Sequence, residues 1–183
     1  MIESREEMKM YIREDAKANR ITSRMRYYVK LLYGNVNAVV FRYLKSLRKY
    51  EYYTNIKSPL RYVYRIYNRR LGLKYNLAIP INVVGYGLYI PHIEGGVIIN
   101  ARRIGNHCTI NSGVVVGANH NNTEIAEIGD NCVLCVGCKV IGRINVGNDV
   151  IVAPNSVVIK DVLPNSVVSG VPAAVIKING QKV

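Results

Sequence analysis

The hydrophobic pattern of this chain changes its period near residue 76. Over residues 128–161, a branched aliphatic side chain recurs at every sixth position, and the same phase continues upstream. A period of six fits neither an amphipathic helix, which repeats every 3.6 residues, nor an isolated strand, which repeats every 2. It is typical of a parallel β-helix, where each short strand and turn forms one side of a coil. The aliphatic positions are Ile104, Ile110, Val116, Ile128, Leu134, Val140, Val146, Val152 and Val158.

Small or β-branched side chains occupy the position four residues after each of these aliphatics except Val116. Three of the four cysteines, Cys108, Cys132 and Cys138, fall on this position. Because a free cysteine packs as a compact hydrophobe, we expect these thiols to be buried and structural. The C-x2-C-x2-C spacing that includes Cys135 is also compatible with zinc or an iron–sulfur cluster, but the repeat explains the cysteines without a metal. We predict no metal site, and reduced thiols favour a cytoplasmic protein.

The six-residue repeat is interrupted at two places. Coil-like structure is predicted to begin near Ile81, and the step from Ile90 to Ile98 is eight residues instead of six. We expect the two extra residues to form an outward bulge at residues 92–96, with the hexads resuming at Ile98. The second interruption is the polar segment at about 117–125, which is predicted to leave the coil as a loop.

The first 76 residues follow a helical pattern. We predict helices at about 5–19, from 23 to Gly34, at 39–53, and from Pro59 toward Arg70, with Gly72 as the terminator. Residues 77–169 are the predicted coil domain, and residues 170–183 a short extended tail. The fold class is therefore mainly β, a hexapeptide-repeat β-helix preceded by an α-helical region.

Charge divides the chain at the same point. Residues 1–76 contain 18 Lys and Arg against 6 Asp and Glu, whereas residues 77–183 contain 7 against 6, and all 14 tyrosines lie at or before Tyr89. The basic half is compatible with nucleic acid, an anionic membrane surface or a phosphorylated substrate, and equally with solvated helix faces. The N-terminus lacks the apolar core of a signal peptide, and no apolar run reaches 18 residues, which also favours a cytoplasmic location.

Two of the three histidines coincide with the interruptions. His92 lies in the expected bulge and His120 in the expected loop, whereas His107 fills a turn inside a regular hexad. The near-neutral pKa of histidine suits it to accept a proton from a hydroxyl group. His92 is the first candidate for a general base, His120 the second, and His107 is expected to be a solvated turn residue.

Several stretches resemble the hexapeptide-repeat acyltransferases, in particular serine O-acetyltransferase-like proteins of surface-polysaccharide biosynthesis. This resemblance implies a left-handed β-helix, a homotrimer and acetyl-CoA as co-substrate. The handedness comes from the family, since the period alone does not define it. The stretches that carry the resemblance are Ile79-Pro80-Ile81-Asn82, Gly87-Leu88-Tyr89-Ile90-Pro91-His92, Ile98-Ile99-Asn100, Ile104-Gly105-Asn106-His107-Cys108 and Gly170-Val171-Pro172-Ala173.

The resemblance also implies residue roles. His92 matches the family's catalytic base, which deprotonates the acceptor hydroxyl in a ternary complex without a covalent acyl-enzyme. The aspartate that orients this histidine in serine acetyltransferases is replaced by Leu77, so Glu94 or a backbone carbonyl is expected to take its place. His120 is implied to be an acceptor-binding group or a rival base.

The same family binds CoA in a groove between coils of adjacent subunits. The implied groove has backbone amides at Val136, Ala153, Pro154 and Gly170. Basic side chains would bind the phosphates, and lysine can meet a phosphate as a point charge. The basic candidates are Lys139, Lys160 and Lys177.

Three classes of function remain open at this point. The first is acetyl transfer either to a sugar hydroxyl of a surface polysaccharide or to free L-serine. The short helical region and Leu77 favour the sugar, and a membrane-bound acceptor would suit the basic helices. The second is a γ-type carbonic anhydrase, which needs histidines five residues apart, whereas the gaps here are 15 and 13 residues. The third is a non-catalytic scaffold or nucleic-acid-binding protein, although no nucleic-acid partner is predicted.

Overall fold

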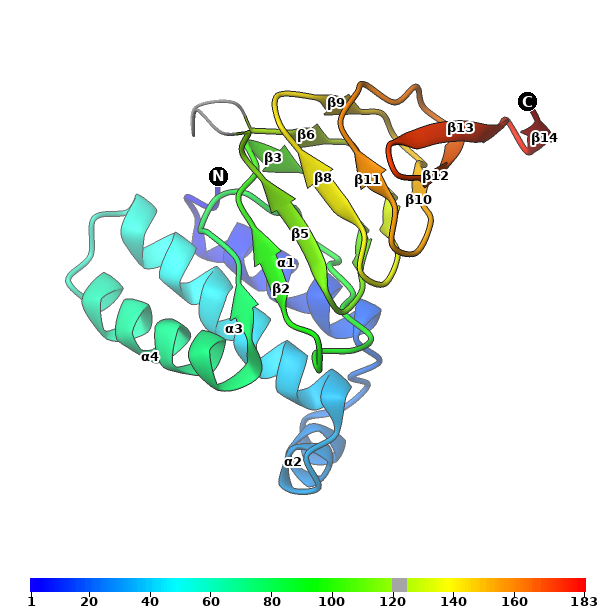
Figure 1. Cartoon of the computed structure of the whole chain (residues 1–183). Helices are drawn as coiled ribbons and strands as arrows, with labels where there is room; N and C mark the ends of the chain where they lie inside the picture. Colours follow the sequence, from blue (N-terminus) through cyan, green and yellow to red (C-terminus); the bar gives the residue numbers. More distant parts are fainter. Residues whose placement is uncertain (120–124) are drawn as a thin grey trace.

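A computed structural model describes residues 1–119 and 125–183, which form a helical region followed by a three-sided coil (Figure 1). The helical region contains α1 (Arg5–Ala18), α2 (Arg24–Leu32), α3 (Val36–Asn55) and α4 (Leu60–Tyr75). A capping box starts α1, because the Ser4 hydroxyl accepts the Glu7 N–H and the Glu7 carboxylate accepts the Ser4 N–H. None of the described helices has a stretch that is both long and apolar enough to cross a bilayer.

The end of α4 differs from the prediction. The helix continues through Gly72 to Tyr75 and ends where Asn76 adopts a left-handed backbone, with φ of 55°. Gly72 is buried, and a Cβ atom there would lie 2.6 Å from the carbonyl oxygen of Leu77. The glycine therefore permits close approach of the helix to the chain that follows it, and the prediction of Gly72 as a terminator was wrong.

Fourteen strands follow in the described residues and form three sheets. Sheet A has the order β1-β2-β5-β8-β11, sheet B β3-β6-β9, and sheet C β4-β7-β10-β12-β13-β14. Pairing is parallel within the coil, as the hexad predicts, and antiparallel only in the β12-β13-β14 extension. The strands are β1 (Leu77–Ala78), β2 (Val97–Ile99), β3 (Arg103–Ile104), β4 (Thr109–Ile110), β5 (Val114–Gly117), β6 (Glu127–Ile128), β7 (Val133–Leu134), β8 (Lys139–Ile141), β9 (Asn145–Val146), β10 (Ile151–Val152), β11 (Val157–Val158), β12 (Ser166–Gly170), β13 (Ala173–Ile178) and β14 (Gln181–Lys182).

The register confirms the six-residue phase. Val140 lies beside Val158 and Leu134 beside Val152, so one regular coil takes 18 residues, or three hexads. Every aliphatic position from Ile104 to Val158 is buried. Cys108, Cys132 and Cys138 are also buried, which confirms their predicted place inside the coil.

The register at the first interruption corrects the prediction. Ile98 points outward and is 53% exposed, whereas Val97 and Ile99 point inward, and Ile99 lies beside Val116. The bulge therefore contains three extra residues between the inward positions 90 and 99. The step from Ile99 to the next inward aliphatic, Ile104, is five residues, one fewer than a hexad. The small side chain of Ala101 is buried at the corner between them. The coil also begins earlier than Ile81, since β1 already pairs with β2.

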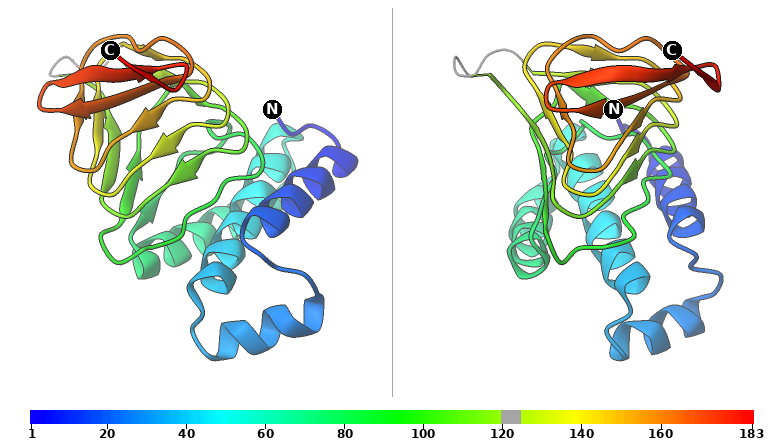
Figure 2. Two further views of the ribbon diagram at one scale, coloured as in Figure 1. Left: turned by 90° about the vertical axis from the view of Figure 1, so that its right-hand side faces the viewer. Right: turned by 45° about the vertical axis from the view of Figure 1, so that its right-hand side comes forward.

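The helices lie against the first coil, at the end opposite the C-terminal hairpin of β13 and β14 (Figure 2). A buried ion cluster lies within this helical region. Arg48 of α3 pairs with Asp15 of α1, with Nε 2.8 Å from Oδ2, and with Glu51 of α3, with Nη1 3.1 Å from Oε2. The side chains of all three are almost completely shielded from solvent.

The ion cluster also contacts the backbone of the first coil. Arg48 donates to the carbonyl oxygens of Val84 and Gly85 at 2.8 and 2.6 Å, and Glu51 accepts the Asn82 N–H at 2.8 Å. Burial raises the pKa of Glu51 more than Arg48 lowers it. Burial acts to lower the pKa of Arg48, but the two carboxylates raise it above its ordinary value, so the guanidinium stays charged.

Candidate functional site

The bulge that carries His92 is fixed to the next coil by its C-terminal end. The Gly95 N–H donates to Ser112 Oγ at 2.7 Å, and the Gly113 N–H donates to the Gly96 carbonyl at 2.6 Å. A Cβ atom on Gly95 would lie 2.6 Å from Ser112 Oγ, so glycine permits this close contact. The His92 side chain at the other end is 63% exposed. The imidazole is therefore accessible on an anchored segment.

Glu94 is the acidic partner of His92. Its Oε2 atom lies 3.9 Å from His92 Nδ1 and accepts the backbone N–H of Ile93 at 3.0 Å. A separation of 3.9 Å exceeds a hydrogen bond but allows an ion pair when the imidazole is protonated. Leu77 is buried in β1, so position 77 presents only hydrocarbon to the core. Glu94 is therefore within ion-pair distance of His92, and its role in place of the family's aspartate stays a prediction.

The other two histidines are placed differently. His107 adopts a left-handed turn with φ of 54°, and its ring packs edge-on against Tyr86 at a centroid distance of 5.1 Å. This contact suits the predicted turn role. His120 lies outside the described residues, so its role as a second base or an acceptor-binding group stays a prediction.

The predicted CoA positions lie along the corner between sheets C and A. Because Leu134, Val152 and Val168 are in register, the residues two positions later, Val136 and Pro154, occupy equivalent corners of successive coils, with Gly170 next in line. The preceding coil has Ser112 at this corner, where it binds the bulge. The structure therefore brings the bulge of His92 and the corner positions of the predicted CoA groove onto one edge.

Two of the backbone N–H groups predicted to line the groove at this corner already have hydrogen-bond partners within the chain. The Ala153 N–H donates to the Val168 carbonyl at 2.9 Å, and the Gly170 N–H donates to Ser156 Oγ at 3.1 Å. Pro154 has no N–H group. Two of these three positions therefore use their N–H groups to hold adjacent coils together, and their predicted place in the lining of a CoA groove stays a prediction. Val136 instead presents an exposed apolar side chain.

The three predicted lysines do not form one cluster within the chain. Lys139 Nζ lies at the C–A corner, where it donates to the carbonyl oxygens of Gly113 and Gly137 at 2.7 and 2.8 Å. Lys160 is exposed after β11, at the turn toward sheet B, and Lys177 lies on β13 beside Val167. Lys139 is therefore the basic candidate that shares an edge with His92.

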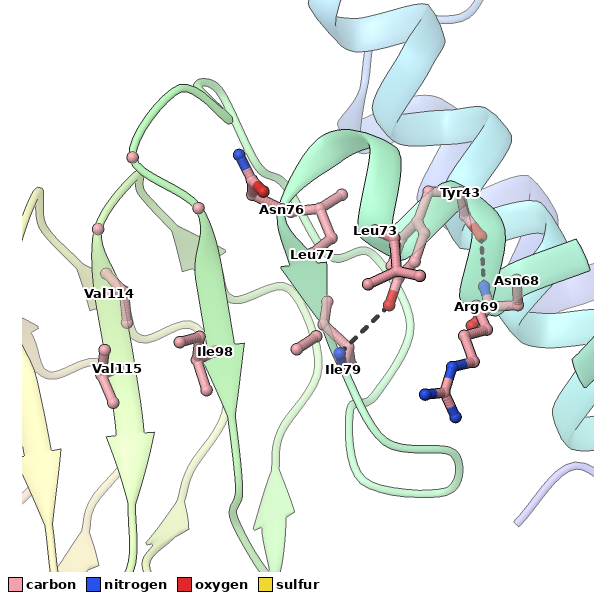
Figure 3. A pocket seen from close by; sticks show the side chains of 15 residues that line it. Tyr43, Asn68, Arg69, Leu73, Asn76, Leu77, Ile79, Ile98, Val114 and Val115 are labelled. Atoms are coloured by element: carbon pink, nitrogen blue, oxygen red, sulfur yellow. Dashed lines mark hydrogen bonds between the residues drawn. The ribbon is translucent and has the colours of Figure 1, made fainter. Parts of the chain in front are cut away.

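A groove of about 600 Å³ borders the bulge (Figure 3). It lies between the C-terminal half of α4 and the outer face of sheet A. Gly95 and Gly96 contribute to its lining, together with Arg69, Asn76 and Ile98. The sequence did not indicate this groove, because its two walls come from segments with different periodicities, and only the fold places them side by side.

The cysteines provide no activated nucleophile at this edge. Burial raises the pKa of Cys138 to about 12, and burial also raises the pKa of Cys135. A thiol with a raised pKa is a weak nucleophile at neutral pH. Within residues 1–119 and 125–183, no three His, Cys, Asp or Glu side chains are grouped so as to hold a metal ion.

Comparison with curated proteins finds serine acetyltransferases. The chain is 35% identical over 102 residues to serine acetyltransferase of Staphylococcus xylosus, covering 55% of this chain and 47% of that protein. It is 36% identical over 99 residues to the Mycobacterium tuberculosis enzyme, covering 53% and 43%. The chain thus spans about half the length of these relatives. No family model matches the chain.

Solved structures extend the likeness over almost the whole chain. A Neisseria gonorrhoeae serine acetyltransferase aligns with a TM-score of 0.71 at 23% identity, covering 97% of this chain and 67% of that one. A serine acetyltransferase in complex with cysteine aligns with a TM-score of 0.75 at 20% identity, covering 95% and 67%. The chain has the serine acetyltransferase fold. One serine acetyltransferase in the comparison is a complex with CoA, at a TM-score of 0.62 and 21% identity, covering 75% and 57%.

These matches confirm serine acetyltransferases as relatives of the chain. They carry no polysaccharide assignment, so that part of the resemblance stays a prediction.

Proposed function

We propose that this chain is an acetyl-CoA-dependent O-acetyltransferase with L-serine as its first candidate acceptor. The observation that carries the proposal is the position of His92. Its accessible imidazole lies on an anchored bulge, on the same edge as Lys139 and the corner residues Val136 and Pro154. The serine acetyltransferase relatives support both the reaction and the acceptor.

In the proposed mechanism, His92 removes the proton from the acceptor hydroxyl as that oxygen attacks the thioester carbonyl carbon of acetyl-CoA. The tetrahedral intermediate then collapses and the C–S bond breaks. The protonated imidazole returns its proton to the departing CoA sulfur, so the base is regenerated in each cycle. The Glu94 carboxylate, 3.9 Å from Nδ1, stabilises the imidazolium while it exists.

On the edge of the coil that carries His92, Lys139 is the residue best placed to attract the CoA phosphates. Its ammonium group is held by two carbonyl oxygens and keeps a third hydrogen-bond donor. Lys160 and Lys177 would contribute to the same groove only across a subunit boundary. A homotrimer, a left-handed coil and a cytoplasmic location belong to this proposal through the family resemblance. A solution mass of three times 20.5 kDa would support the trimer.

A sugar hydroxyl is the second candidate acceptor. Replacement of the family's aspartate by the buried Leu77 distinguishes this chain from the serine enzymes and supports a different acceptor. The groove between α4 and sheet A, about 600 Å³ in volume, is large enough for a ligand bigger than serine. The named relatives support L-serine as the first candidate, which reverses the order that the sequence favoured.

The test is release of free CoA from acetyl-CoA, measured with L-serine and with a panel of nucleotide sugars. His92→Ala should lower kcat/KM at least about a hundredfold, the scale of general-base catalysis. Glu94→Gln should lower kcat less than His92→Ala does, and it should shift the pH profile of kcat. Lys182 is exposed on β14, so Lys182→Gln should leave kcat and its pH profile unchanged. Near-normal turnover of His92→Ala in a folded protein would assign the base elsewhere, and no CoA release with any acceptor would refute the proposed activity.

A further inference from the structure

Helix α2 has apolar side chains on two faces, and only one of them is covered. Tyr27 is buried, and its ring packs edge-on against Phe41 of α3 at 5.4 Å. The other apolar side chains recur at the spacing of one helical face and are exposed, up to 87% at Leu32 and Tyr33. These exposed residues are Met25, Tyr28, Val29, Leu32 and Tyr33. We name them the α2 stripe.

The segment of chain that contains this stripe has no exposed acidic side chain. From residue 16 to residue 93 the chain contains 15 Lys and Arg and a single acidic residue, Glu51. Glu51 is buried against Arg48, so it does not offset the surface charge. This segment therefore carries 14 basic side chains besides the buried Arg48, and no exposed carboxylate.

Three of these cations converge in a cleft beside the stripe. Arg42, Lys45 and Lys49 of α3 line a cleft of about 370 Å³ between α2, α3 and α4, and all three are half-buried. Among the described residues, none of them forms an ion pair with a carboxylate. Half-buried cations without counter-charges favour an anionic ligand.

Tyrosine side chains complete the cleft. Arg42 Nε donates to Tyr67 Oη at 2.9 Å, and Lys49 Nζ donates to Tyr64 Oη at 3.2 Å. Tyr28 lines the same cleft and also belongs to the α2 stripe. The cleft and the α2 stripe are therefore one continuous surface. Helix α2 lies at the end of the molecule opposite the C-terminal hairpin (Figures 1 and 2).

The combination of charge and apolar exposure selects the partner. A second copy of this surface would bring cations against cations. A nucleic acid would match the charge, but it has no acyl-chain region for Met25, Val29 and Leu32 to enter. An anionic bilayer provides both, since phosphates meet the cations while the apolar side chains enter the boundary of the acyl chains. Tyrosine is also favoured at such an interface.

We propose that the α2 stripe and the adjoining cleft dock this protein on anionic phospholipid membranes. The apolar residues of α2 insert at the level of the headgroups, and Arg42, Lys45 and Lys49 bind lipid phosphates. This attachment is peripheral and does not depend on the acetyl-transfer proposal, because none of its residues takes part in that site.

The test is flotation of the full chain with vesicles of phosphatidylcholine alone or mixed with phosphatidylglycerol. We expect at least about tenfold stronger binding to the anionic vesicles and weaker binding as salt rises, since juxtaposed charges are screened. Equal binding to both vesicles, or binding to neither, would overturn the proposal. Retention on duplex DNA without vesicle binding would assign the surface to nucleic acid instead.

Two variants and two matched controls locate the surface. Leu32→Asp on the stripe and Lys45→Glu in the cleft should each weaken binding about tenfold or more. Leu163→Asp and Lys182→Glu make the same changes at exposed positions of the coil and hairpin, and should bind like the wild type. Controls that lose as much binding as the variants would overturn the assignment. If Lys45→Glu fails to fold, Leu32→Asp and the salt dependence decide.

Discussion

The coil and the helical region bury different kinds of side chain. Within the described residues, the buried polar side chains of the coil are Ser156 and Ser166, whereas the helical region buries the charged Asp15, Arg48 and Glu51. In the coil, each inward position repeats the chemistry of the one six residues before it. In the helical region, each buried group requires a specific partner far along the chain. Periodic packing can thus be recognised locally, while a buried ion cluster depends on the assembled fold.

The difference also separates the surfaces of the two regions. The coil has nearly balanced charge and places His92 and the predicted CoA positions along one corner. The helices have a large positive excess and an exposed apolar face on α2. The comparison suggests that chemistry and attachment lie on separate parts of the molecule, and the following variants test the physical difference between the regions.

The largest effect is expected inside the coil. Val140 is fully buried, so Val140→Asp places a carboxylate among aliphatic side chains without a partner. We expect a loss of unfolding free energy of about 4–5 kcal/mol or more, measured by urea denaturation. Ile151→Asp, on the exposed face of β10, should cost less than about 1 kcal/mol. Equal losses in the two variants would contradict the inward and outward register.

A smaller but still severe effect is expected in the ion cluster. Arg48→Met leaves Asp15 and Glu51 buried without their cation, which typically costs about 3–5 kcal/mol. Thermal unfolding should show the loss, whereas Arg65→Met, at an exposed position of α4, should stay within about 0.5 kcal/mol. A stable Arg48→Met protein would mean that the ion cluster is not needed to hold the two regions together.

Gly72→Ala tests the contact between α4 and the start of the coil. Alanine usually favours a helix over glycine by about 1 kcal/mol. Here its Cβ would lie 2.6 Å from the Leu77 carbonyl oxygen, so we expect a net destabilisation of about 1–3 kcal/mol. Leu73→Ala, at the exposed neighbouring position, should have little effect in the same urea titration. A stabilised Gly72→Ala protein would show that the helix does not pack this closely.

The smallest effect at neutral pH is expected for Tyr43→Phe. Tyr43 Oη accepts the Ile79 N–H at 3.2 Å, and loss of that bond should cost about 1 kcal/mol. Burial raises the pKa of Tyr43 from 10.0 to about 12. In the wild type, ionisation of the unfolded chain between pH 10 and 12 should therefore remove up to about 2.7 kcal/mol of stability.

Tyr43→Phe lacks this titration, so its stability relative to the wild type should improve as pH rises through that range. Denaturation curves of the two proteins at pH 9 and 11.5 measure the change. A constant difference would show that Tyr43 is solvated when the protein is folded.

Prediction from sequence succeeded where structure follows from neighbouring residues. The hexad indicated which aliphatics and cysteines lie inside the coil, and the helical pattern indicated the start of α1 at residue 5. It failed at Ile98 and Gly72, because a bulge can absorb an odd number of residues and a helical glycine can serve a close contact. The predicted CoA positions from Val136 to Gly170 lie along one corner of the coil, where the N–H groups of Ala153 and Gly170 already donate between coils, and their binding of CoA stays a prediction.

The sequence by itself determined the three-sided coil, the phase of its core and the interruption that presents His92. These features depend on a local alternation of aliphatic, small and turn residues. A short stretch of the coil displays this alternation without reference to the rest of the chain. Only the tertiary structure decided that α4 and sheet A enclose a groove beside the bulge, and that Arg48 joins α1 to α3 and contacts the first coil. Those arrangements depend on distances between segments that are far apart in sequence, and no local periodicity encodes them.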